Sequence, residues 1–347
     1  MKGEHKNSYD RRQMLRRLRR LTEGYRTAQT LFAAARLGIF DALGRGRMTA
    51  TELARRLDAD PRATRMLCDA LAALGLLVKE RDRYGCAPLA RETLLRNSPQ
   101  SQLPLVLHNA ELYERWAALD RTVRTGAPPA REGRRDAGAF AQAMASAAVE
   151  AAEETAAVLD LAGARRAMDL GGGPGVYAIQ MARRWKRLQV VVTDFPETLK
   201  TTRRIVKAAG LSDRIHCRPA DVLKDPLGGG YDFILISNVI HSFGPEENRL
   251  VLRRAAEALA PGGRIAVKDF LLSRSRTRPA QAALFALNML VNTPAGDCYT
   301  AEEVKAWLQE AGLQFAGRAR LSPPSSIVFG VKPAGPRRAG GGRAKRP

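Results

Sequence analysis

A glycine-rich segment between a short apolar run and a helical pattern constrains the fold of this chain more than any other feature. The apolar run 167–170 is followed by Gly171, Gly173 and Gly175, and a helical pattern comes next. Glycine lets the backbone approach a ligand where any Cβ would clash. In open α/β sheets, nucleotides bind where strands end and helices begin. The segment therefore predicts a strand, a nucleotide-binding loop and a helix in succession.

Short apolar runs continue to alternate with helical patterns after residue 165. They occupy residues 190–193, 215–217, 233–236 and 264–267, and residues 328–331 form a candidate last strand. Strands separated by helices predict a parallel sheet, because the chain must cross over between neighbouring strands. The fold class expected for this half is α/β.

The first hundred residues are predicted to be mainly helical. Apolar side chains recur at three- and four-residue steps over residues 9–43. A capping-box spacing starts a short helix after Thr49, and another helix runs from Pro61 to Leu74. Residues 76–86 have the pattern of a small hairpin. The order helix, helix, hairpin is that of a winged-helix domain.

The chain is strongly basic, and its charge is concentrated at the two ends. It has 347 residues, with 57 Lys and Arg against 35 Asp and Glu, for a net charge of +22. Basic ends favour binding to nucleic acid or to anionic surfaces. However, residues 332–347 contain no aromatic side chain on which a base could stack. We therefore expect solvated ends, with a flexible segment at 1–20 and a disordered tail at 333–347.

Length and composition exclude several other classes of protein. Hydrophobic residues make up 45% and charged residues 27% of the chain, which is typical of a soluble globular protein of two domains. No run of about 18 uncharged apolar residues predicts a membrane span, and no secretory signal is apparent. The four cysteines lie far apart without CxxC spacing. They indicate reduced thiols in a cytoplasmic protein and neither a disulfide framework nor a metal site.

The glycine-rich segment departs from two common phosphate-binding patterns. No Gly-Lys-Ser/Thr follows it, which excludes a P-loop, and Val176 stands where a dinucleotide fingerprint has its third glycine. Asp194 ends the next predicted strand, about 20 residues on, where a ribose-binding acid is expected. An aspartate, then Gly-x-Gly-x-Gly, then this second acid resembles motif I of the S-adenosylmethionine-dependent methyltransferases.

Further segments narrow this resemblance. Asp221 and Val222 follow the third predicted strand, as in those enzymes, and a turn at 259–264 precedes the fifth. Segments in both halves of the chain are similar to O-methyltransferases of the caffeate/acetylserotonin (hydroxyindole) type. These segments are residues 28–43, 52–54, 69–77, 194–196 and 238–241.

The resemblance covers roughly residues 20–332 and implies a domain organisation. It implies a Rossmann-like, doubly wound, mostly parallel class I methyltransferase sheet over residues 161–332. It also implies an N-terminal, all-helical winged-helix dimerisation domain over residues 21–100, and hence a homodimer. Residues 101–160 would form a helical linker that contributes to the substrate pocket.

The resemblance implies S-adenosylmethionine as the cofactor and a set of residues that hold it. A carboxylate such as Asp194 suits the two ribose hydroxyls because it offers two acceptors and no donor. Ser237 stands where plant members of the family have a lysine, so this contact is altered. The cofactor-binding residues implied are Asp169, Gly171, Gly173, Asp194, Phe195, Asp221, Val222 and Ser237.

The family's catalytic base is a histidine after the fourth strand, which corresponds to His241. Of the four histidines, His5 lies in a basic end, His108 in the helical linker and His216 within a predicted strand. An imidazole with a pKa near about 6.5 can take the proton of a phenol, whose pKa is near about 10. Asp269, after the fifth strand, is implied to orient this base.

A second carboxylate of plant members is replaced by Cys298, although Asp297 is adjacent. Cysteine cannot supply the same charge, so methylation of carbon or nitrogen stays open beside O-methylation. An apolar pocket lined by Met and Phe would suit an aromatic acceptor. The candidate substrate-binding residues are Phe140, Met144, Phe285, Asn288 and Met289.

Two other functions compete with methylation of a small molecule. An RNA or protein methyltransferase could hold a polyanion with the basic ends. A DNA-binding regulator could use the helix 61–74 for recognition, with Arg62 and Arg65 facing DNA. That helix is also apolar along one face, which favours packing in its own domain. We expect a methyltransferase that acts on a small molecule, without a metal and without nucleic acid.

Overall fold

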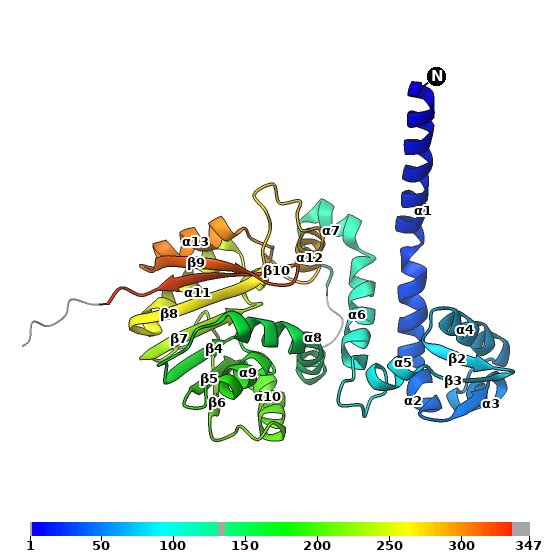
Figure 1. The fold of residues 1–347 in the computed structure, drawn as a ribbon, viewed down its shortest axis with the longest axis horizontal. Coiled ribbons are helices and arrows are strands. Elements are labelled where there is room, and N and C mark those ends of the chain that lie inside the picture. Colours follow the sequence, from blue (N-terminus) through cyan, green and yellow to red (C-terminus); the bar gives the residue numbers. More distant parts are fainter. Residues whose placement is uncertain (1, 131–135, 335–347) are drawn as a thin grey trace, which may run out of the picture. The chain divides into compact units, whose positions relative to one another are not determined.

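The computed structural model describes residues 2–130 and 136–334, with the backbone alone for residues 2–10. The chain divides into two compact units, with the boundary between Tyr113 and Glu114 (Figure 1). The disordered tail predicted at 333–347 lies outside the described residues from position 335 onward.

The first unit combines helices with a small antiparallel sheet. Its helices are α1 (Lys2–Leu37), α2 (Ile39–Leu43), α3 (Ala50–Leu57), α4 (Pro61–Ala73), α5 (Pro88–Thr93) and most of α6 (Leu103–Trp116). Its strands are β1 (Arg47–Thr49), β2 (Leu77–Glu80) and β3 (Arg83–Cys86), in the order β1-β3-β2. The unit is mainly helical as predicted, but the small sheet means that it is not all-helical. The hairpin β2–β3 is present as predicted, and β1 adds a third strand that is too short to show a sequence pattern.

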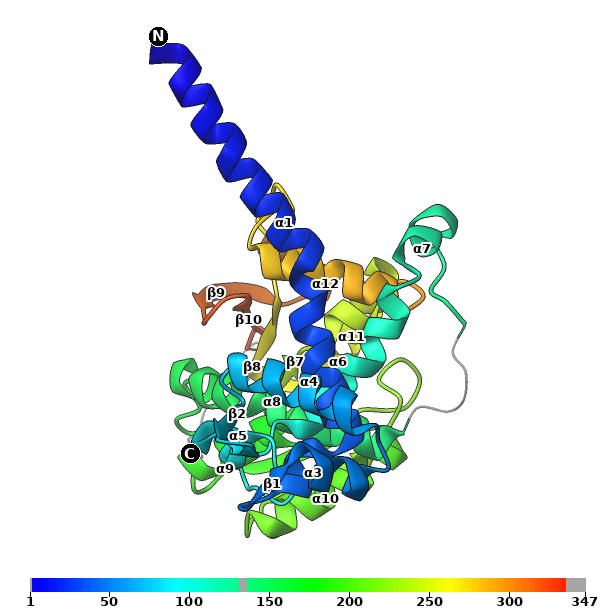
Figure 2. The ribbon, with the colours of Figure 1, turned by 90° about the vertical axis from the view of Figure 1, so that its right-hand side faces the viewer.

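Helix α1 is longer than the apolar pattern predicts. It begins at Lys2 and runs without a break to Leu37 (Figure 2). The structure thus has helical backbone over most of residues 1–20, where the sequence analysis expects a flexible segment. Residues 4–23 contain no Gly or Pro and are rich in Arg and Leu, which favour helix even without an apolar face. Gly38, with a left-handed φ of 73°, separates α1 from α2.

The capping box predicted at the start of α3 is confirmed. The backbone N–H of Glu52 donates to Thr49 Oγ1 at 3.2 Å, and that of Thr49 donates to Glu52 Oε2 at 2.7 Å. Behind these helices, Phe40, Leu53 and Leu71 are buried in one apolar core. The unit therefore has its own hydrophobic core.

The second unit is built on a seven-stranded sheet in the order β6-β5-β4-β7-β8-β10-β9. The first five strands are parallel, and β10 and β9 are antiparallel to their neighbours. The predicted mostly parallel sheet is therefore confirmed. The strands are β4 (Arg166–Leu170), β5 (Gln189–Asp194), β6 (Ile215–Pro219), β7 (Tyr231–Ser237), β8 (Leu259–Phe270), β9 (Gln314–Arg320) and β10 (Ser325–Val331).

Helices cover both faces of this sheet. The helices of this unit are α7 (Leu119–Thr125), α8 (Ala137–Val158), α9 (Val176–Arg184), α10 (Pro196–Ala208), η1 (Ile240–Ser242), α11 (Pro245–Ala258), α12 (Ala280–Leu290) and α13 (Ala301–Glu310). One core joins α8, α9 and α10 to the sheet, and a second core joins α11 and α13 to its other face. The labels in Figure 1 show these two groups on opposite sides of the strands.

The order of the strands reverses at β4, which lies between β5 and β7. The loops after β4 and β7 therefore leave the sheet beside each other, and open α/β sheets bind ligands at such a switch point. The glycine-rich segment follows β4 there, and His241 follows β7. Strand β9 was not predicted, because this edge strand has mostly exposed residues and lacks apolar alternation.

Candidate active site

The glycine-rich loop is shaped by three residues with different constraints. A Cβ on Gly171 would lie 2.7 Å from Val239 Cγ2, and one on Gly172 would lie 2.6 Å from Asp169 Cγ. Gly173 has a left-handed φ of 52°, and no described atom lies within 4 Å of the position of its missing Cβ. The first two glycines therefore allow close packing, whereas the backbone at Gly173 faces open space.

Asp169 supports the helix that begins after this loop. Its carboxylate is buried, and Oδ2 accepts a hydrogen bond from the Ala178 N–H at 3.2 Å. Oδ1 has no partner among the residues that the structure describes. The pKa of Asp169 is raised to about 7, chiefly by burial; the Ala178 N–H opposes this shift and the nearby Asp194 charge adds to it. An oxygen without a partner at this depth is available to a polar group of a ligand.

Asp194 ends β5 and fixes the same loop from the other side. Its Oδ2 accepts from the Gly173 N–H at 2.9 Å, and its Oδ1 accepts from the Phe195 N–H at 2.7 Å. Burial raises the pKa of Asp194, although the two backbone N–H groups and a hydrogen bond from the Thr198 side chain oppose the shift. Each carboxylate oxygen can accept a second hydrogen bond. Phe195, the next residue after Asp194, is 58% exposed.

The residues after β6 and β7 complete this end of the sheet. Asp221 Oδ1 accepts from the Leu223 N–H at 2.9 Å, which closes a tight turn, and Val222 is buried. Ser237, the last residue of β7, is buried, and its Oγ has no partner among the described residues. The described residues therefore leave this buried hydroxyl without a hydrogen-bond partner.

These observations test whether a nucleoside cofactor would fit. The backbone is open at Gly173, the Asp194 carboxylate retains acceptor capacity, and the Ser237 hydroxyl is unsatisfied. A ribose diol and an amino-acid ammonium group offer the donors that such oxygens require. The residues present fit S-adenosylmethionine at the switch point.

His241 lies in η1, directly after β7, and is oriented by Asp269 at the end of β8. His241 Nδ1 is 2.8 Å from Asp269 Oδ1, and the His241 backbone N–H lies 3.4 Å from Oδ2. Burial alone would raise the pKa of Asp269. The His241 contact, the Phe270 N–H and the Lys268 charge together hold this pKa below its usual range. The carboxylate therefore stays ionised and binds Nδ1, which leaves Nε2 as the nitrogen that can accept a proton.

Two phenylalanines surround the imidazole ring. The Phe285 ring meets His241 edge-on, with centroids 4.9 Å apart, and the Phe270 ring is stacked at 6.3 Å. The two phenylalanine rings are in turn 4.7 Å apart in an edge-to-face contact. The sequence analysis names Phe285 but not Phe270, although Phe270 directly follows the predicted Asp269.

The segment before α13 supplies no second carboxylate to the histidine within the described part of the chain. Asp297 Oδ2 accepts from Arg276 Nη2 at 2.6 Å, so this carboxylate is engaged by an arginine. Cys298 is buried, and burial raises the pKa of its thiol to about 12, with Asp269 and Asp297 adding to the shift. The thiol is therefore neutral at physiological pH, and Asp269 orients His241 alone.

The five candidate substrate residues are distributed over two helices. Phe285, Asn288 and Met289 lie on α12, which packs against η1, whereas Phe140 and Met144 lie on α8, which packs against α9 and α10. Asn288 Oδ1 accepts from Trp116 Nε1 at 3.0 Å. The structure thus brings Phe285 to His241, and the contribution of the α8 residues to a pocket stays a prediction.

Three polar or aromatic neighbours of the site were missed by the sequence analysis. Lys268 is 1% exposed, and its Nζ donates to Asn238 Oδ1 at 3.0 Å. Asn238 Nδ2 lies 3.4 Å from the hydroxyl oxygen of Tyr177 on α9. A lysine directly after the apolar run 265–267 is the one sequence signal that could have indicated this cluster.

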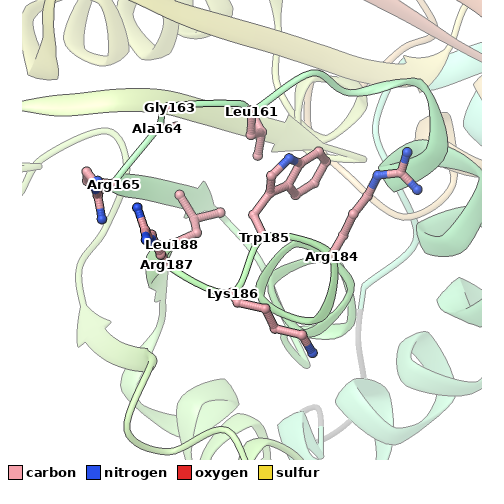
Figure 3. Close-up of a pocket in the computed structure, with 9 residues that line it drawn as sticks. All are labelled: Leu161, Gly163, Ala164, Arg165, Arg184, Trp185, Lys186, Arg187 and Leu188. Carbon is pink, nitrogen blue, oxygen red and sulfur yellow. The ribbon is translucent and has the colours of Figure 1, made fainter.

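A cavity of ≈ 270 Å³ lies away from these residues (Figure 3). It is lined by residues before β4 and between α9 and β5, including Trp185, Arg165 and Arg187. These segments lie at the amino ends of the strands, whereas His241 and Asp194 follow carboxyl ends. The cavity therefore contains none of the predicted site residues.

The described residues contain no group of three or more His, Cys, Asp or Glu side chains that could hold a metal ion. They also contain no helix that is both long enough and apolar enough to span a bilayer.

Comparisons with known proteins agree with this geometry. The family model of the O-methyltransferase domain matches residues 129–314, and that of the O-methyltransferase dimerisation domain matches residues 19–97. A 3-hydroxy-5-methyl-1-naphthoate 3-O-methyltransferase of Streptomyces sahachiroi is 34% identical over 90% of this chain and 94% of its own length.

Two more relatives extend the comparison. A tetracenomycin polyketide synthesis 8-O-methyl transferase of Streptomyces glaucescens is 29% identical over 90% of this chain and 95% of its own length. The structure of human N-acetylserotonin methyltransferase in complex with S-adenosylmethionine has a TM-score of 0.82 at 26% identity. It covers 93% of this chain and 98% of its own. The chain therefore belongs to the S-adenosylmethionine-dependent O-methyltransferases that carry an N-terminal dimerisation domain.

Proposed function

We propose that this chain methylates a hydroxyl group of a small aromatic acceptor, with His241 as the general base. The observation that carries this proposal is the 2.8 Å contact between His241 Nδ1 and Asp269 Oδ1. This contact fixes the tautomer with a proton on Nδ1, because a buried carboxylate can only accept. Nε2 then has a free lone pair for the proton of an acceptor hydroxyl.

The cofactor, when bound, supplies an electrophilic methyl group on a sulfonium centre. The role of the chain is to align the acceptor hydroxyl with that methyl group and to remove the hydroxyl proton as the oxygen attacks. His241 Nε2 takes the proton, and Asp269 stabilises the imidazolium that forms. General-base assistance of this kind contributes about 10²–10⁴-fold to a rate.

We assign cofactor binding to the residues around the switch point. Asp194 accepts from the ribose hydroxyls, and Asp221 with Val222 borders the adenine, beside the exposed ring of Phe195. Gly171 and Gly173 let the backbone lie against the cofactor. Ser237 and the free oxygen of Asp169 face its amino-acid part, because both are buried polar atoms that lack a partner among the described residues.

The proposed acceptor is aromatic for two reasons. The rings of Phe270 and Phe285 border the base and offer flat apolar surfaces to another ring. The Streptomyces sahachiroi relative is named for methylation at the hydroxyl of a naphthoate. Met289 extends the same apolar wall from α12, and Phe140 and Met144 extend it from α8. Asn288 acts mainly by holding Trp116.

We infer further properties from the family of the chain. The first unit is a winged-helix dimerisation domain, and the protein acts as a homodimer. The helices of residues 101–160 contribute to the acceptor pocket, and residues 161–332 bind the cofactor. The protein works in the cytoplasm, in secondary metabolism, on small molecules and not on nucleic acid.

The variant His241→Ala tests the proposed base. We expect turnover of a hydroxynaphthoate or hydroxybenzoate panel to fall by about 10²–10⁴-fold. The dissociation constant of S-adenosylhomocysteine in calorimetry should stay within about twofold, because the base does not hold the cofactor. His216→Ala is the matched control, since His216 contacts Gln189 away from the site. Turnover by His241→Ala at the wild-type rate would contradict the assignment.

A further inference from the structure

Lys268 is a buried lysine that forms no salt bridge with a carboxylate in the described part of the chain. It is 1% exposed, and among the described residues no carboxylate oxygen lies within salt-bridge distance of its Nζ. Lysine is almost never buried without a partner, because removing its charge from water is costly. Its partners here are the amide oxygen of Asn238 at 3.0 Å and the ring faces of Tyr177 and Phe270, at 5.6 and 5.3 Å. Such contacts stabilise a desolvated cation.

The partner of this lysine has an unusual backbone conformation. Asn238 follows the last residue of β7 and has a φ of 57°, in the left-handed region. Its backbone N–H donates to the Lys268 carbonyl at 2.9 Å, and its side-chain oxygen accepts from Lys268 Nζ. Asparagine tolerates this region better than most residues, but the conformation still carries strain. Lys268 therefore holds Asn238 at two points on adjacent strands.

The turn fixed in this way carries the base. His241 lies three residues after Asn238, in the single 3-10 turn η1. The next residue after Lys268 is Asp269, which binds the His241 imidazole. One strand end thus controls both the path of the chain into His241 and the partner of its ring. A shift of about 1 Å in a catalytic group can cost about 10²-fold in rate.

We propose that Lys268 is a positioning residue for His241, which acts through the side chain of Asn238. This inference rests on the proposed function, because it presumes that His241 is the base. Lys268 holds Asn238 in the left-handed turn, and the turn directs His241 Nδ1 to Asp269. Lys268 itself touches neither the acceptor nor the transferred methyl group.

The first test compares Lys268→Met with Asn238→Gly. Methionine keeps an unbranched side chain that is one atom shorter than lysine and has no donor, and glycine keeps the left-handed turn without the amide. We expect each variant to lower kcat by about 10- to 100-fold while KM and the dissociation constant of S-adenosylhomocysteine stay within about twofold. The double variant should lose no more than the worse single variant, because both break the same contact. A double loss equal to the product of the single losses overturns the route through Asn238.

Lys332→Met is the matched control for the loss of a structural lysine. Lys332 Nζ donates to the carbonyls of Ala256 and Leu259, at 2.7 Å each, at the other end of β8. We expect its kcat to equal that of the wild type. If Lys268→Met does not fold, Asn238→Gly decides alone, and an unchanged kcat for that folded variant overturns the proposal.

A spectroscopic readout separates this inference from the proposed function. With four histidines in the chain, the His241 imidazole can be identified by ¹⁵N-histidine NMR through its loss in His241→Ala. We expect the Nδ1–H signal of the Asp269-bound tautomer in the wild type, and its weakening in Lys268→Met. If His241→Ala is fully active, the proposed base is wrong, whatever this signal does. If His241→Ala is inactive and Lys268→Met changes neither signal nor kcat, only the role of Lys268 is wrong.

Discussion

Two buried aspartates near the ends of β4 and β8 have pKa values shifted in opposite directions. Asp169, under the glycine-rich loop, accepts one backbone hydrogen bond, and burial raises its pKa to about 7. Asp269, beside His241, is equally buried, but its pKa is held below the usual range. The difference is the neighbourhood, because Asp269 has an imidazole and a lysine nearby, whereas Asp169 has another carboxylate. Burial by itself makes a carboxyl neutral, and opposite charge is needed to keep it ionised.

This contrast matches the different roles proposed for the glycine-rich loop, which binds the cofactor, and for the pair of His241 and Asp269, which removes a proton. In the proposed cofactor region, Asp169 Oδ1 has no hydrogen-bond partner among the described residues, so it can accept from a donor of a ligand. In the proposed catalytic region, Asp269 Oδ1 lies 2.8 Å from His241 Nδ1 and accepts from the Phe270 N–H at 2.8 Å. On this proposal, contacts within the protein pre-organise the pair of Asp269 and His241, whereas a ligand completes the hydrogen bonding of Asp169 and Ser237.

The largest effect is expected from removing the charge of Asp269. Asp269→Asn keeps the shape of the side chain, but it can bind the wrong tautomer of His241, and kcat should fall by about 10²–10⁴-fold. Binding of S-adenosylhomocysteine, measured by calorimetry, should stay within about twofold. Because the folded pKa is lowered, the carboxylate stabilises the protein above its unfolded pKa, and this stabilisation is lost as the pH falls through the folded value. A variant that retains full turnover would remove the distinction between the two aspartates.

A smaller effect is expected in the cofactor region, from two alanine substitutions in one loop. Gly172→Ala places a Cβ 2.6 Å from Asp169 Cγ and should lower the free energy of unfolding by about 1–3 kcal/mol. Gly173→Ala meets no atom but adopts a left-handed φ, at a cost of about 1 kcal/mol. Denaturant unfolding should therefore rank Gly172→Ala as less stable. Calorimetry with S-adenosylhomocysteine should show weakened binding in Gly173→Ala, since its new methyl group points into open space. If Gly173→Ala were the less stable variant, this account of the packing of the loop would be wrong.

The smallest effect is expected from making Asp169 permanently neutral. Because the folded pKa is about 7, the folded state binds a proton on Asp169 more tightly than the unfolded state does. This group therefore contributes stability at low pH that is lost as the pH rises from about 4 to about 7. In Asp169→Asn, the drop in unfolding free energy between pH 5 and pH 8 should be smaller than in the wild type by about 2 kcal/mol. The exposed Asp213→Asn is the control, and equal drops in both variants would count against a neutral Asp169.

Much of the architecture could be predicted from the sequence because its signals are local. The capping box at Thr49, the helix at Pro61 and the five parallel strands each depend on a few adjacent residues. The pairing of His241 with Asp269 required the resemblance to a family, since 28 positions separate the two residues. The contact itself is present in the structure as that resemblance implies.

The parts that were missed depend on contacts between distant segments. Strand β1 forms only because the hairpin offers it an edge, and β9 is an exposed edge strand of mixed polarity. One cluster joins α9, the end of β7 and β8 through Tyr177, Asn238 and Lys268. Because these residues are far apart in the sequence, no spacing predicts their contact. Asp297 was a candidate second carboxylate by adjacency, and its partner Arg276 lies 21 positions away.

The alternation of side chains along β8 has a consequence for how this family member can change. Lys268 meets Asn238 and Tyr177, whereas its neighbour Asp269 meets His241. Successive residues of a strand point to opposite sides, so a slip of one residue would exchange the two. A cation would then face the imidazole, and a carboxylate would lie against the rings of Tyr177 and Phe270. Single-residue insertions or deletions in this strand should therefore be far less tolerated than substitutions, because they invert the chemistry of both sides at once.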